Sequence, residues 1–319
     1  MKRTNYIDLV NRKVIIAQIT GSIQEEDLEI PPNCSGFGRI RHFKRFIEDW
    51  NNDPLPIDPA LKALGKNSTD LMLAQVFQLA YCNMNCWYCF VPDELKSGKV
   101  FSWFSAEELF DKFLEENISD CYVIDISGGN PELTPEFVLW FMQAMMKKKK
   151  ENDYYLWSDD SISTNSMESN LSRQDIEFMS NYKNYGKVCC FKGFDKYSYH
   201  FNTGYNESVY KDQFTYVKKY IDYGFDVYAY ITLTTDNLDN IEKNIGGFFD
   251  YVQKNITEHF PLRIVPLKII EFSPTQKRLN INYKRAILNQ KVVLNIWNEE
   301  IEKRFSPEQR DMNIADIKG

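Results

Sequence analysis

A repeated alternation of short apolar runs and amphipathic segments constrains the fold of this chain more than any other feature. From residue 71 onward, six apolar runs of strand length occur, and a segment with helical spacing of apolar residues follows each one. The runs span residues 71–80, 121–126, 154–157, 188–191, 227–232 and 264–270. Repeated β-then-α units imply parallel strands joined by right-handed crossovers. Since six units cannot close an eight-stranded barrel, the sequence predicts an α/β fold with a partial, open (β/α)6 barrel of the TIM type.

The segments between these strands carry helix start signals. Ser105 and Glu108 form a capping-box pattern that predicts a helix over 105–114, and Pro135 after Thr134 suits the first position of the next helix. Apolar spacing predicts further helices over 173–182, 210–223, 241–256 and 286–305. The first 66 residues lack this rhythm. We therefore expect an irregular N-terminal extension over 1–66, the barrel over 67–280, and a C-terminal helix and tail over 281–319.

Composition narrows the classes of function. The 319 residues include 38 Lys and Arg against 45 Asp and Glu, a formal net charge of −7. This balance argues against a protein held to nucleic acid or anionic lipid by general attraction. The longest apolar candidate, residues 137–146, is about half as long as a bilayer-spanning helix and contains Gln143. Because no apolar signal core lies near the N-terminus, we expect a cytoplasmic protein without a membrane partner.

Three of the seven cysteines lie close together, in Cys82-Asn-Met-Asn-Cys86-Trp-Tyr-Cys89, directly after the first predicted strand. An odd number of cysteines argues against a disulfide framework. Three thiolates on a cubic iron–sulfur cluster leave one iron free for a small-molecule ligand. One alternative is a zinc site, which usually has a fourth Cys or His nearby in sequence, and another is three unrelated buried cysteines. No His lies near this loop, and Asn83 and Asn85 are unusual in a core strand, so the spacing favours the cluster.

The C-x3-C-x-aromatic-C pattern resembles the signature of the radical S-adenosylmethionine (radical SAM) superfamily. The resemblance extends over roughly residues 71–275, and the core is similar to that of activating enzymes for glycyl radical proteins, without identifying a subfamily. It implies a [4Fe–4S] cluster bound by Cys82, Cys86 and Cys89, with S-adenosylmethionine bound to the open iron. It also implies that Tyr88 lies along the adenine ring.

A glycine-rich turn follows the second predicted strand, in Ser127-Gly128-Gly129-Asn130-Pro131-Glu132. Glycines allow close backbone approach to a ligand, and barrel sites form at the C-terminal ends of strands. The family has a similar turn here, often Gly-Gly-Glu-Pro, and the resemblance implies contact with the methionine amino group. Because Asn130 stands where Glu is common, we expect backbone carbonyls of this turn, Gly128 to Pro131, to make the contact. An ordinary strand-to-helix turn is the alternative.

Polar residues at other strand ends are further candidates for binding the cofactor. Ser158 and Asp160 follow the third predicted strand, where relatives place polar groups near the methionine or ribose. Alternation puts Thr232 and Thr234 on one face of the fifth strand, so both hydroxyls are plausible ligand partners if that face points inward. Lys268 lies near the end of the sixth strand and could contact cofactor or substrate.

The fourth predicted strand contributes Cys190 and Lys192, which share one face by alternation. The segment is similar to one in the glycyl-radical activating enzymes, which implies that Lys192 pairs with the methionine carboxylate. A solvated lysine is the alternative. Cys190 could donate a hydrogen atom to a substrate radical, as in some relatives, whereas a strand cysteine is more often a small buried apolar residue.

Residues 39–47 combine four basic side chains with apolar positions, and this pattern predicts an amphipathic helix with a solvated basic face. A phosphate-bearing or nucleic-acid substrate is the alternative. The acidic net charge argues against that alternative. The basic residues concerned are Arg39, Arg41, Lys44 and Arg45.

With the resemblance, these residues predict an oxidoreductase that cleaves S-adenosylmethionine reductively. The resulting 5′-deoxyadenosyl radical would abstract a hydrogen atom from an unknown protein, peptide, nucleotide or phosphate-bearing small molecule. A reductase such as flavodoxin or ferredoxin would supply the electron. Two alternatives remain open: a protein that binds an iron–sulfur cluster or zinc without cleaving the cofactor, and an enzyme that transfers an aminocarboxypropyl or methyl group.

Overall fold

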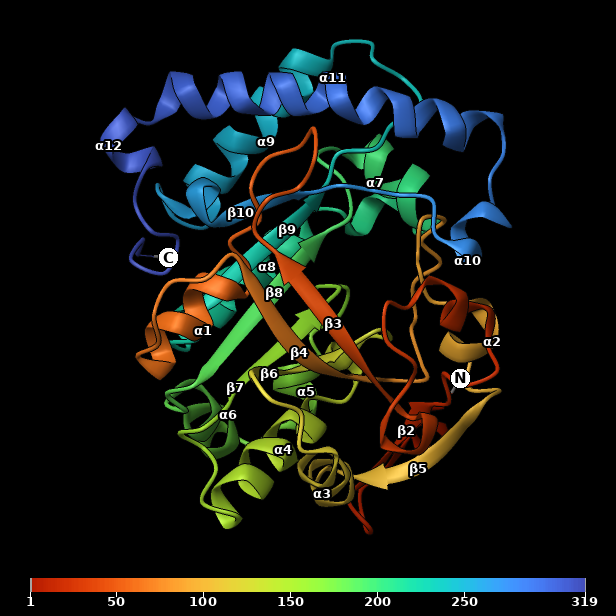
Figure 1. Ribbon diagram of the computed structural model, residues 1–319. Coiled ribbons are helices and arrows are strands. Elements are labelled where there is room, and N and C mark those ends of the chain that lie inside the picture. Colours follow the sequence, from red (N-terminus) through yellow and green to blue (C-terminus); the bar gives the residue numbers. More distant parts are fainter. Residues whose placement is uncertain (1, 319) are drawn as a thin grey trace.

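The computed structural model describes residues 2–318 and shows a curled sheet of seven strands with helices packed around it (Figure 1). The order across the sheet is β10-β9-β8-β7-β6-β4-β3. Neighbours from β4 to β10 are parallel, whereas β3 pairs antiparallel with β4. The prediction of an open (β/α)6 barrel is therefore confirmed. The strands are β3 (Gly38–Lys44), β4 (Leu71–Gln78), β6 (Cys121–Ser127), β7 (Tyr155–Asp160), β8 (Tyr185–Phe191), β9 (Val227–Thr232) and β10 (Ile264–Leu267).

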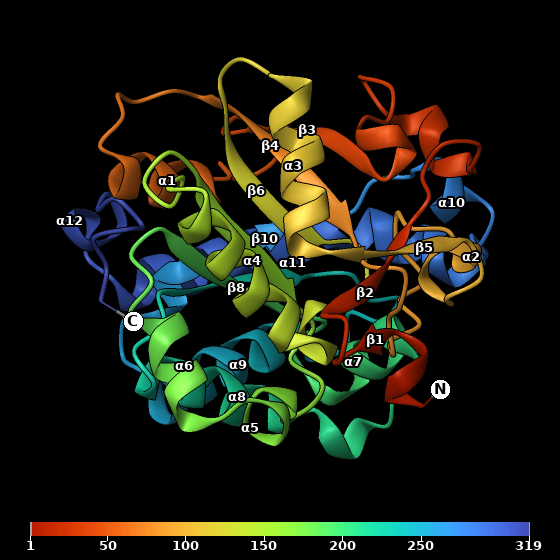
Figure 2. The same cartoon turned by 90° about the horizontal axis from the view of Figure 1, so that it is seen from below.

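Helices cover the convex face of the sheet, and Figure 2 shows α3, α4, α6, α8 and α9 along this side. Apolar side chains from these helices and from alternate strand residues form one large buried cluster. The capping box predicted at Ser105 is present at the start of α3. The helices are α1 (Ile57–Leu64), α2 (Asp93–Lys96), α3 (Ala106–Glu116), α4 (Pro135–Lys147), α5 (Ser166–Asn170), α6 (Arg173–Ser180), α7 (Lys196–Thr203), α8 (Asp212–Asp222), α9 (Ile241–Asn255), α10 (Ser273–Gln276), α11 (Ile281–Arg304) and α12 (Pro307–Arg310).

The helix predicted over residues 39–47 is wrong, because most of this segment is strand β3. Its backbone pairs along the whole of β4, with Arg39 opposite Val76 and Phe43 opposite Met72. The pairing gives the segment a period of two, so Phe43 packs on the concave side while Ile40 joins the cluster on the convex side. The N-terminal extension thus supplies the seventh strand of the sheet.

The segment that follows β3 crosses the gap between the two edges of the open barrel. Trp50 donates a hydrogen bond from Nε1 to the carbonyl of Pro266 in β10 at 2.8 Å. Farther along, the buried Asp53 accepts a hydrogen bond from the Tyr230 hydroxyl of β9 at 2.9 Å. Residues 45–55 therefore link the strand at one edge, β3, to the strands at the other edge.

A second, three-stranded sheet lies beside the C-terminal end of β4. It contains β1 (Ile7–Asp8), β2 (Lys13–Ala17) and β5 (Phe101–Ser105), all antiparallel. Ala80, just after β4, donates from its backbone to the Ile15 carbonyl at 3.1 Å. The rings of Tyr6 and Tyr81 stack with their centroids 4.4 Å apart. This small sheet therefore fixes the chain at the point where the cysteine-rich loop begins.

No helix within residues 2–318 is both long enough and apolar enough to span a bilayer.

The buried carboxyl of Asp53 generates a prediction about stability. Burial raises the pKa of Asp53 to about 6, so the folded protein holds this proton more tightly than the unfolded chain does. Stability from this group is fully present below its unfolded pKa of 3.8 and is lost as the pH rises through about 6. Asp53→Asn should remove this loss, on the order of 1–3 kcal/mol. Thermal melting of both proteins between about pH 4.5 and about pH 7.5 measures it.

Relative to the Asn variant, the parent should lose melting temperature as the pH increases through this range. Asp239→Asn, at an exposed position after β9, is the control and should differ from the parent by a constant amount. A constant difference for Asp53→Asn as well would show that Asp53 does not titrate in this range in the folded protein.

Candidate cofactor site

The cysteine-rich loop, residues 81–92, lies at the C-terminal end of β4 and leads into α2. Cys86 is buried, and Cys82 and Cys89 are half-buried. Within residues 2–318, no three His, Cys, Asp or Glu side chains converge on a common metal position. The three thiols share one loop, and Cys86 and Cys89 lie close enough to Cys82 to raise its pKa.

The surroundings of these thiols oppose ionisation in the absence of a metal. Burial, together with the neighbouring Cys86 and Cys89, raises the pKa of Cys82 to about 12. Burial also raises the pKa of Cys86. A buried thiolate needs a compensating positive charge, and iron bound directly to sulfur supplies it. The donor set of three thiols therefore fits a metal cluster better than free thiolates.

Segments distant in sequence hold the backbone of this loop. Arg278, after α10, donates to the carbonyls of Cys89 at 2.5 Å and Val91 at 2.8 Å. Thr275 donates from Oγ1 to the Tyr88 carbonyl at 3.2 Å. Figure 1 shows α2, α7 and α10 at the end of the sheet toward which the parallel strands run. The carbonyl groups of the loop thus accept hydrogen bonds from side chains about 190 residues away, which no local sequence motif predicts.

Asn202 in α7 joins three parts of the site through its fully buried amide. Its Oδ1 accepts hydrogen bonds from Trp87 Nε1 at 3.1 Å and from Thr234 Oγ1 at 2.7 Å. Its Nδ2 donates to the carbonyls of Lys192 at 2.9 Å and Thr234 at 3.1 Å. The four bonds use the full hydrogen-bonding capacity of the amide. Sequence reasoning missed Asn202, because its partners come from three separate segments.

Trp87 is also held from the other side. Its ring stacks on Tyr283 of α11, with centroids 4.5 Å apart and planes 5° apart. The C-terminal helix, assigned by the sequence to a segment outside the barrel, therefore contacts the residue between Cys86 and Tyr88.

The glycine turn after β6 packs tightly against the start of the cysteine-rich loop. A Cβ on Gly129 would lie 2.5 Å from the carbonyl oxygens of Leu79 and Tyr81, and Gly128 has a φ of +81°. The Asn130 backbone donates to the Tyr81 carbonyl at 2.9 Å. A side chain on Gly129 would therefore displace the backbone of the loop, whereas one on Gly128 would meet the side chain of Gln78 and would require a positive φ.

The side chain of Asn130 extends this contact. Its Nδ2 donates to Asn83 Oδ1 at 2.7 Å, and its Oδ1 accepts from the Ser161 backbone at 3.2 Å. Glu132, buried in the same turn, accepts from the backbones of Ser163 at 2.9 Å and Thr164 at 2.6 Å. The turn thus connects the cysteine-rich loop to the loop after β7. Pro131 follows Asn130 and begins a short 3-10 helix.

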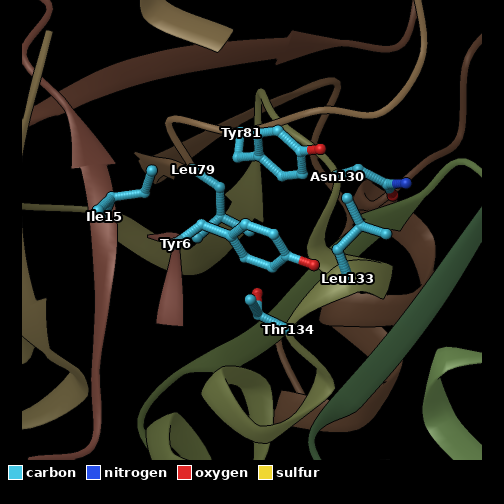
Figure 3. Close-up of a pocket in the computed structure, with 7 residues that line it drawn as sticks. All are labelled: Tyr6, Ile15, Leu79, Tyr81, Asn130, Leu133 and Thr134. Carbon is cyan, nitrogen blue, oxygen red and sulfur yellow. The ribbon is translucent and has the colours of Figure 1, made fainter. Parts of the chain in front are cut away.

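Figure 3 shows a small cavity between the N-terminal segment and the glycine turn. Its volume of about 10 Å³ suits one water molecule, so it does not hold the cofactor. A larger cavity of about 260 Å³ is lined by Ile264, at the beginning of β10, and therefore lies at the other end of the sheet. The small cavity is lined by Tyr6, Ile15, Leu79, Tyr81, Asn130, Leu133 and Thr134.

Cys190 and Lys192 both lie on the concave side of β8, since Cys190 packs against the cluster of that face. Although burial lowers the pKa of Lys192, the neighbouring Cys190, Tyr88 and Cys86 raise it by more, so it lies well above its usual value. Burial raises the pKa of Cys190 to about 12, which keeps the thiol protonated. The ammonium group of Lys192 therefore lies next to the cysteine-rich loop.

Thr232 and Thr234 also reach this region. Thr232 donates from Oγ1 to the Tyr88 hydroxyl at 2.9 Å. Thr234 contacts Asn202, as described above. Both hydroxyls thus face the cysteine-rich loop and α7, and Tyr88 is held by its hydroxyl.

The structure does not bring Ser158, Asp160 and Lys268 to the same place. Ser158 hydrogen-bonds the Tyr185 hydroxyl at 2.7 Å, and Asp160 forms a buried ion pair with Lys187. Both lie on the convex side of β7, because the neighbouring Trp157 packs on the concave side. Lys268 donates from Nζ to the Glu48 carbonyl at 2.5 Å near the surface.

Asp159, between Ser158 and Asp160, is the carboxyl that faces the barrel interior. It shares the face of Trp157 by alternation. Its Oδ1 is enclosed and has no hydrogen-bond partner among residues 2–318. Alternation places Ser158 and Asp160 on the same face of β7. Whether that face points inward or outward depends on the curl of the whole sheet.

The four basic residues of the segment 39–47 do not form a common exposed surface. Arg39 is only 6% exposed. Arg41 lies 3.8 Å from the buried Asp125. Lys44 pairs with Glu29 at 2.8 Å, and Arg45 pairs with Asp58 at 2.5 Å and Asp70 at 2.9 Å.

Substitution of Asn202 tests whether its hydrogen bonds organise the site. Asn202→Ala should leave Trp87 Nε1, Thr234 Oγ1 and two carbonyls without partners, at about 1–3 kcal/mol for each group left buried and unpaired. We expect a lower melting temperature and less iron per chain after anaerobic reconstitution. Asn67→Ala, at an exposed position before β4, is the control and should match the parent. Full iron loading of Asn202→Ala would show that the cysteine-rich loop does not need this amide.

Comparison with known proteins adds an independent line of support. The sequence profile described as the Radical SAM superfamily matches residues 79–246, more than half of the chain. No curated protein matches the chain. The structure is similar to Streptococcus suis SuiB bound to S-adenosylmethionine, with a TM-score of 0.51 and 13% identity over 77% of this chain and 51% of that one. It also matches anSMEcpe with bound AdoMet, with a TM-score of 0.46 and 16% identity over 70% of this chain and 57% of that one.

This chain spans about half the length of SuiB, so the likeness concerns the shared fold. The profile begins at Leu79, just before the three cysteines, and ends within α9. It thus covers the cysteine-rich loop, the glycine turn and the strand ends that carry Lys192 and Thr232. The chain belongs to the radical SAM superfamily.

Proposed function

We propose that this protein binds a [4Fe–4S] cluster through Cys82, Cys86 and Cys89 and cleaves S-adenosylmethionine reductively to abstract a hydrogen atom from a substrate. The observation that carries the proposal is the placement of these three thiols in one loop at the C-terminal end of β4. Barrel enzymes bind substrates and cofactors at this end of the sheet. Three thiolates leave one iron for the amino and carboxylate groups of S-adenosylmethionine. When bound, the cluster and S-adenosylmethionine would supply the radical chemistry.

The residues of the chain would bind and orient S-adenosylmethionine. The tight glycine turn at Gly128 and Gly129 brings backbone close to the cysteine-rich loop, where its carbonyls would accept from the methionine ammonium group. Lys192 would provide a cation for the methionine carboxylate, because its ammonium group lies beside Cys86 and Cys190. Tyr88, held by Thr232, would contact the adenine ring. Each contact uses a group that already faces the cysteine-rich loop.

The position of Cys190 on the concave side of β8 supports a further role. Cys190 is protonated and half-buried beside Lys192, so it is placed to donate a hydrogen atom to a substrate radical. The electron that begins the reaction would come from a reductase such as flavodoxin or ferredoxin. The buried surroundings of the loop would exclude water from the reactive species.

The first test removes one thiol. Cys86→Ala should abolish the brown absorbance of the reconstituted protein and its production of 5′-deoxyadenosine, because two thiolates cannot hold a cubic cluster firmly. Cys121→Ala, at the start of β6, is the matched control for loss of a buried sulfur and should keep both properties. The measurements are iron and sulfide per chain and product analysis with dithionite-reduced protein and S-adenosylmethionine.

Three other outcomes would contradict the proposal. Methylthioadenosine as the sole nucleoside product would indicate aminocarboxypropyl transfer. Stoichiometric zinc without iron, or an intact cluster with no cleavage, would indicate a binding protein.

The second test concerns the cation beside the loop. Lys192→Ala should keep its cluster and fold but bind S-adenosylmethionine about ten- to a hundredfold more weakly, because one charge-assisted contact is worth about 1.5–3 kcal/mol. Titration of the reduced cluster followed by electron paramagnetic resonance measures the affinity. Lys196→Ala, exposed at the start of α7, is the control and should resemble the parent. Equal affinity in Lys192→Ala and the parent would remove Lys192 from the cofactor site.

A further inference from the structure

Arg39 is a buried cation that forms no ion pair with any residue from 2 to 318. Its side chain lies on the concave side of β3, and the residue is 6% exposed. Its Nε is enclosed without a hydrogen-bond partner among residues 2–318, and the guanidinium forms no ion pair with them. Burying an unpaired charge is costly, so proteins usually pair such groups or leave them in water. Arg39 therefore stands out from the other arginines of the segment 39–47, which pair with carboxylates.

The position of Arg39 connects it to the cofactor site. It pairs with Val76 near the C-terminal end of β4, two residues before that strand ends. Its guanidinium carbon lies 5.2 Å from the ring centroid of Phe90, the residue directly after Cys89. The unpaired cation is thus next to the cysteine-rich loop, where a substrate must come close to react.

Two carboxyl groups, those of Asp125 and Asp159, lie near Arg39, but neither forms an ion pair with it. Asp125 lies 3.8 Å from Arg41, and it also accepts a hydrogen bond from Ser127 at 3.1 Å. Burial and the nearby Asp125 raise the pKa of Asp159 well above its usual value, which favours its neutral form. Burial and Arg41 lower the pKa of Arg39 to about 10, although Asp125 and Asp159 act in the opposite direction, so Arg39 remains charged at neutral pH. Arg39 therefore keeps its charge near the loop without a direct ion pair among residues 2–318.

We propose that Arg39 binds an oxyanion of the substrate, either a carboxylate or a phosphate. Arg41, which lies on the same face of β3 and pairs with Asp125, supports it. A guanidinium presents a planar fork of donors that matches either group in a bidentate arrangement. An anion bound there would anchor one end of the substrate beside Phe90 and hold the rest near the three cysteines. This inference rests on the proposed function only in calling the bound molecule a substrate, since the oxyanion site itself does not require S-adenosylmethionine cleavage.

The experiment titrates cluster-loaded protein with inorganic phosphate and, separately, with malonate, using isothermal titration calorimetry. Arg39→Gln should weaken binding of the preferred anion about ten- to a hundredfold, the range for loss of a hydrogen bond to a charged group. Arg39→Lys should bind the anion with an affinity between those of the parent and Arg39→Gln, because lysine keeps the charge but lacks the planar fork of donors. Preference for phosphate would indicate a phosphate ester, and preference for malonate would indicate a carboxylate-bearing substrate.

Arg285→Gln, on an exposed turn of α11, is the matched control and should bind both anions like the parent. Absence of binding by the parent to either anion, or equal binding by Arg39→Gln, would overturn the proposal. Arg39→Met separates binding from folding, because it should melt at the parent's temperature or above it in anion-free buffer. A clearly lower melting temperature would instead assign Arg39 a structural role.

The two proposals can fail independently. Anion binding that depends on Arg39, with no 5′-deoxyadenosine formed by the parent, would overturn only the proposed function. Production of 5′-deoxyadenosine without anion binding would overturn only the oxyanion site.

Discussion

The site depends on four hydrogen bonds made by one buried amide, that of Asn202. The cysteine-rich loop has little regular secondary structure, so its conformation must come from contacts with other segments. Asn202 supplies contacts to the loop at Trp87 and to the chain after β8 and β9. Stacking of Trp87 on Tyr283 and the hydrogen bonds from Arg278 hold the same loop through other segments. Side-chain contacts therefore position the ends of β8 and β9 and helix α11 relative to the cysteines. Backbone hydrogen bonds between the strands hold the sheet itself.

The added strand β3 covers one edge of the parallel sheet and contributes two arginines to the concave face of the barrel. A run of parallel strands from β4 to β10 would leave β4 as an open edge with unpaired backbone groups. β3 covers that edge, and residues 45–55 then reach β10 and β9 through Trp50 and Asp53. The same strand carries Arg39 and Arg41 into the concave face, opposite the acidic residues of β6 and β7. One segment thus protects the edge of the sheet and introduces charge near the cofactor site.

The repeating core was predictable from the sequence because its signals are local. Apolar runs and the capping box at Ser105 reveal strands and helices without knowledge of distant contacts, and β9 has the predicted bounds. Strand β3 was not predicted, because Ile40, Phe43 and Phe46 recur at a spacing that also suits a helix and the pairing with β4 is not visible in the sequence. Alternation correctly grouped Cys190 with Lys192, but it could not say that Asp159, rather than Asp160, faces the interior. That choice is made by the curl of the whole sheet.

The order of strands has a consequence for how the protein is made. Within the seven-stranded sheet, each strand lies beside the strand of that sheet that precedes it in the chain, so the barrel can assemble progressively as the polypeptide emerges from the ribosome. The cysteine-rich loop emerges early, whereas Arg278 and Tyr283, which hold it, emerge near the end of synthesis. Until then the three thiols belong to a loop without its last supports. Completion of the chain therefore sets the earliest moment at which the loop can adopt its final conformation.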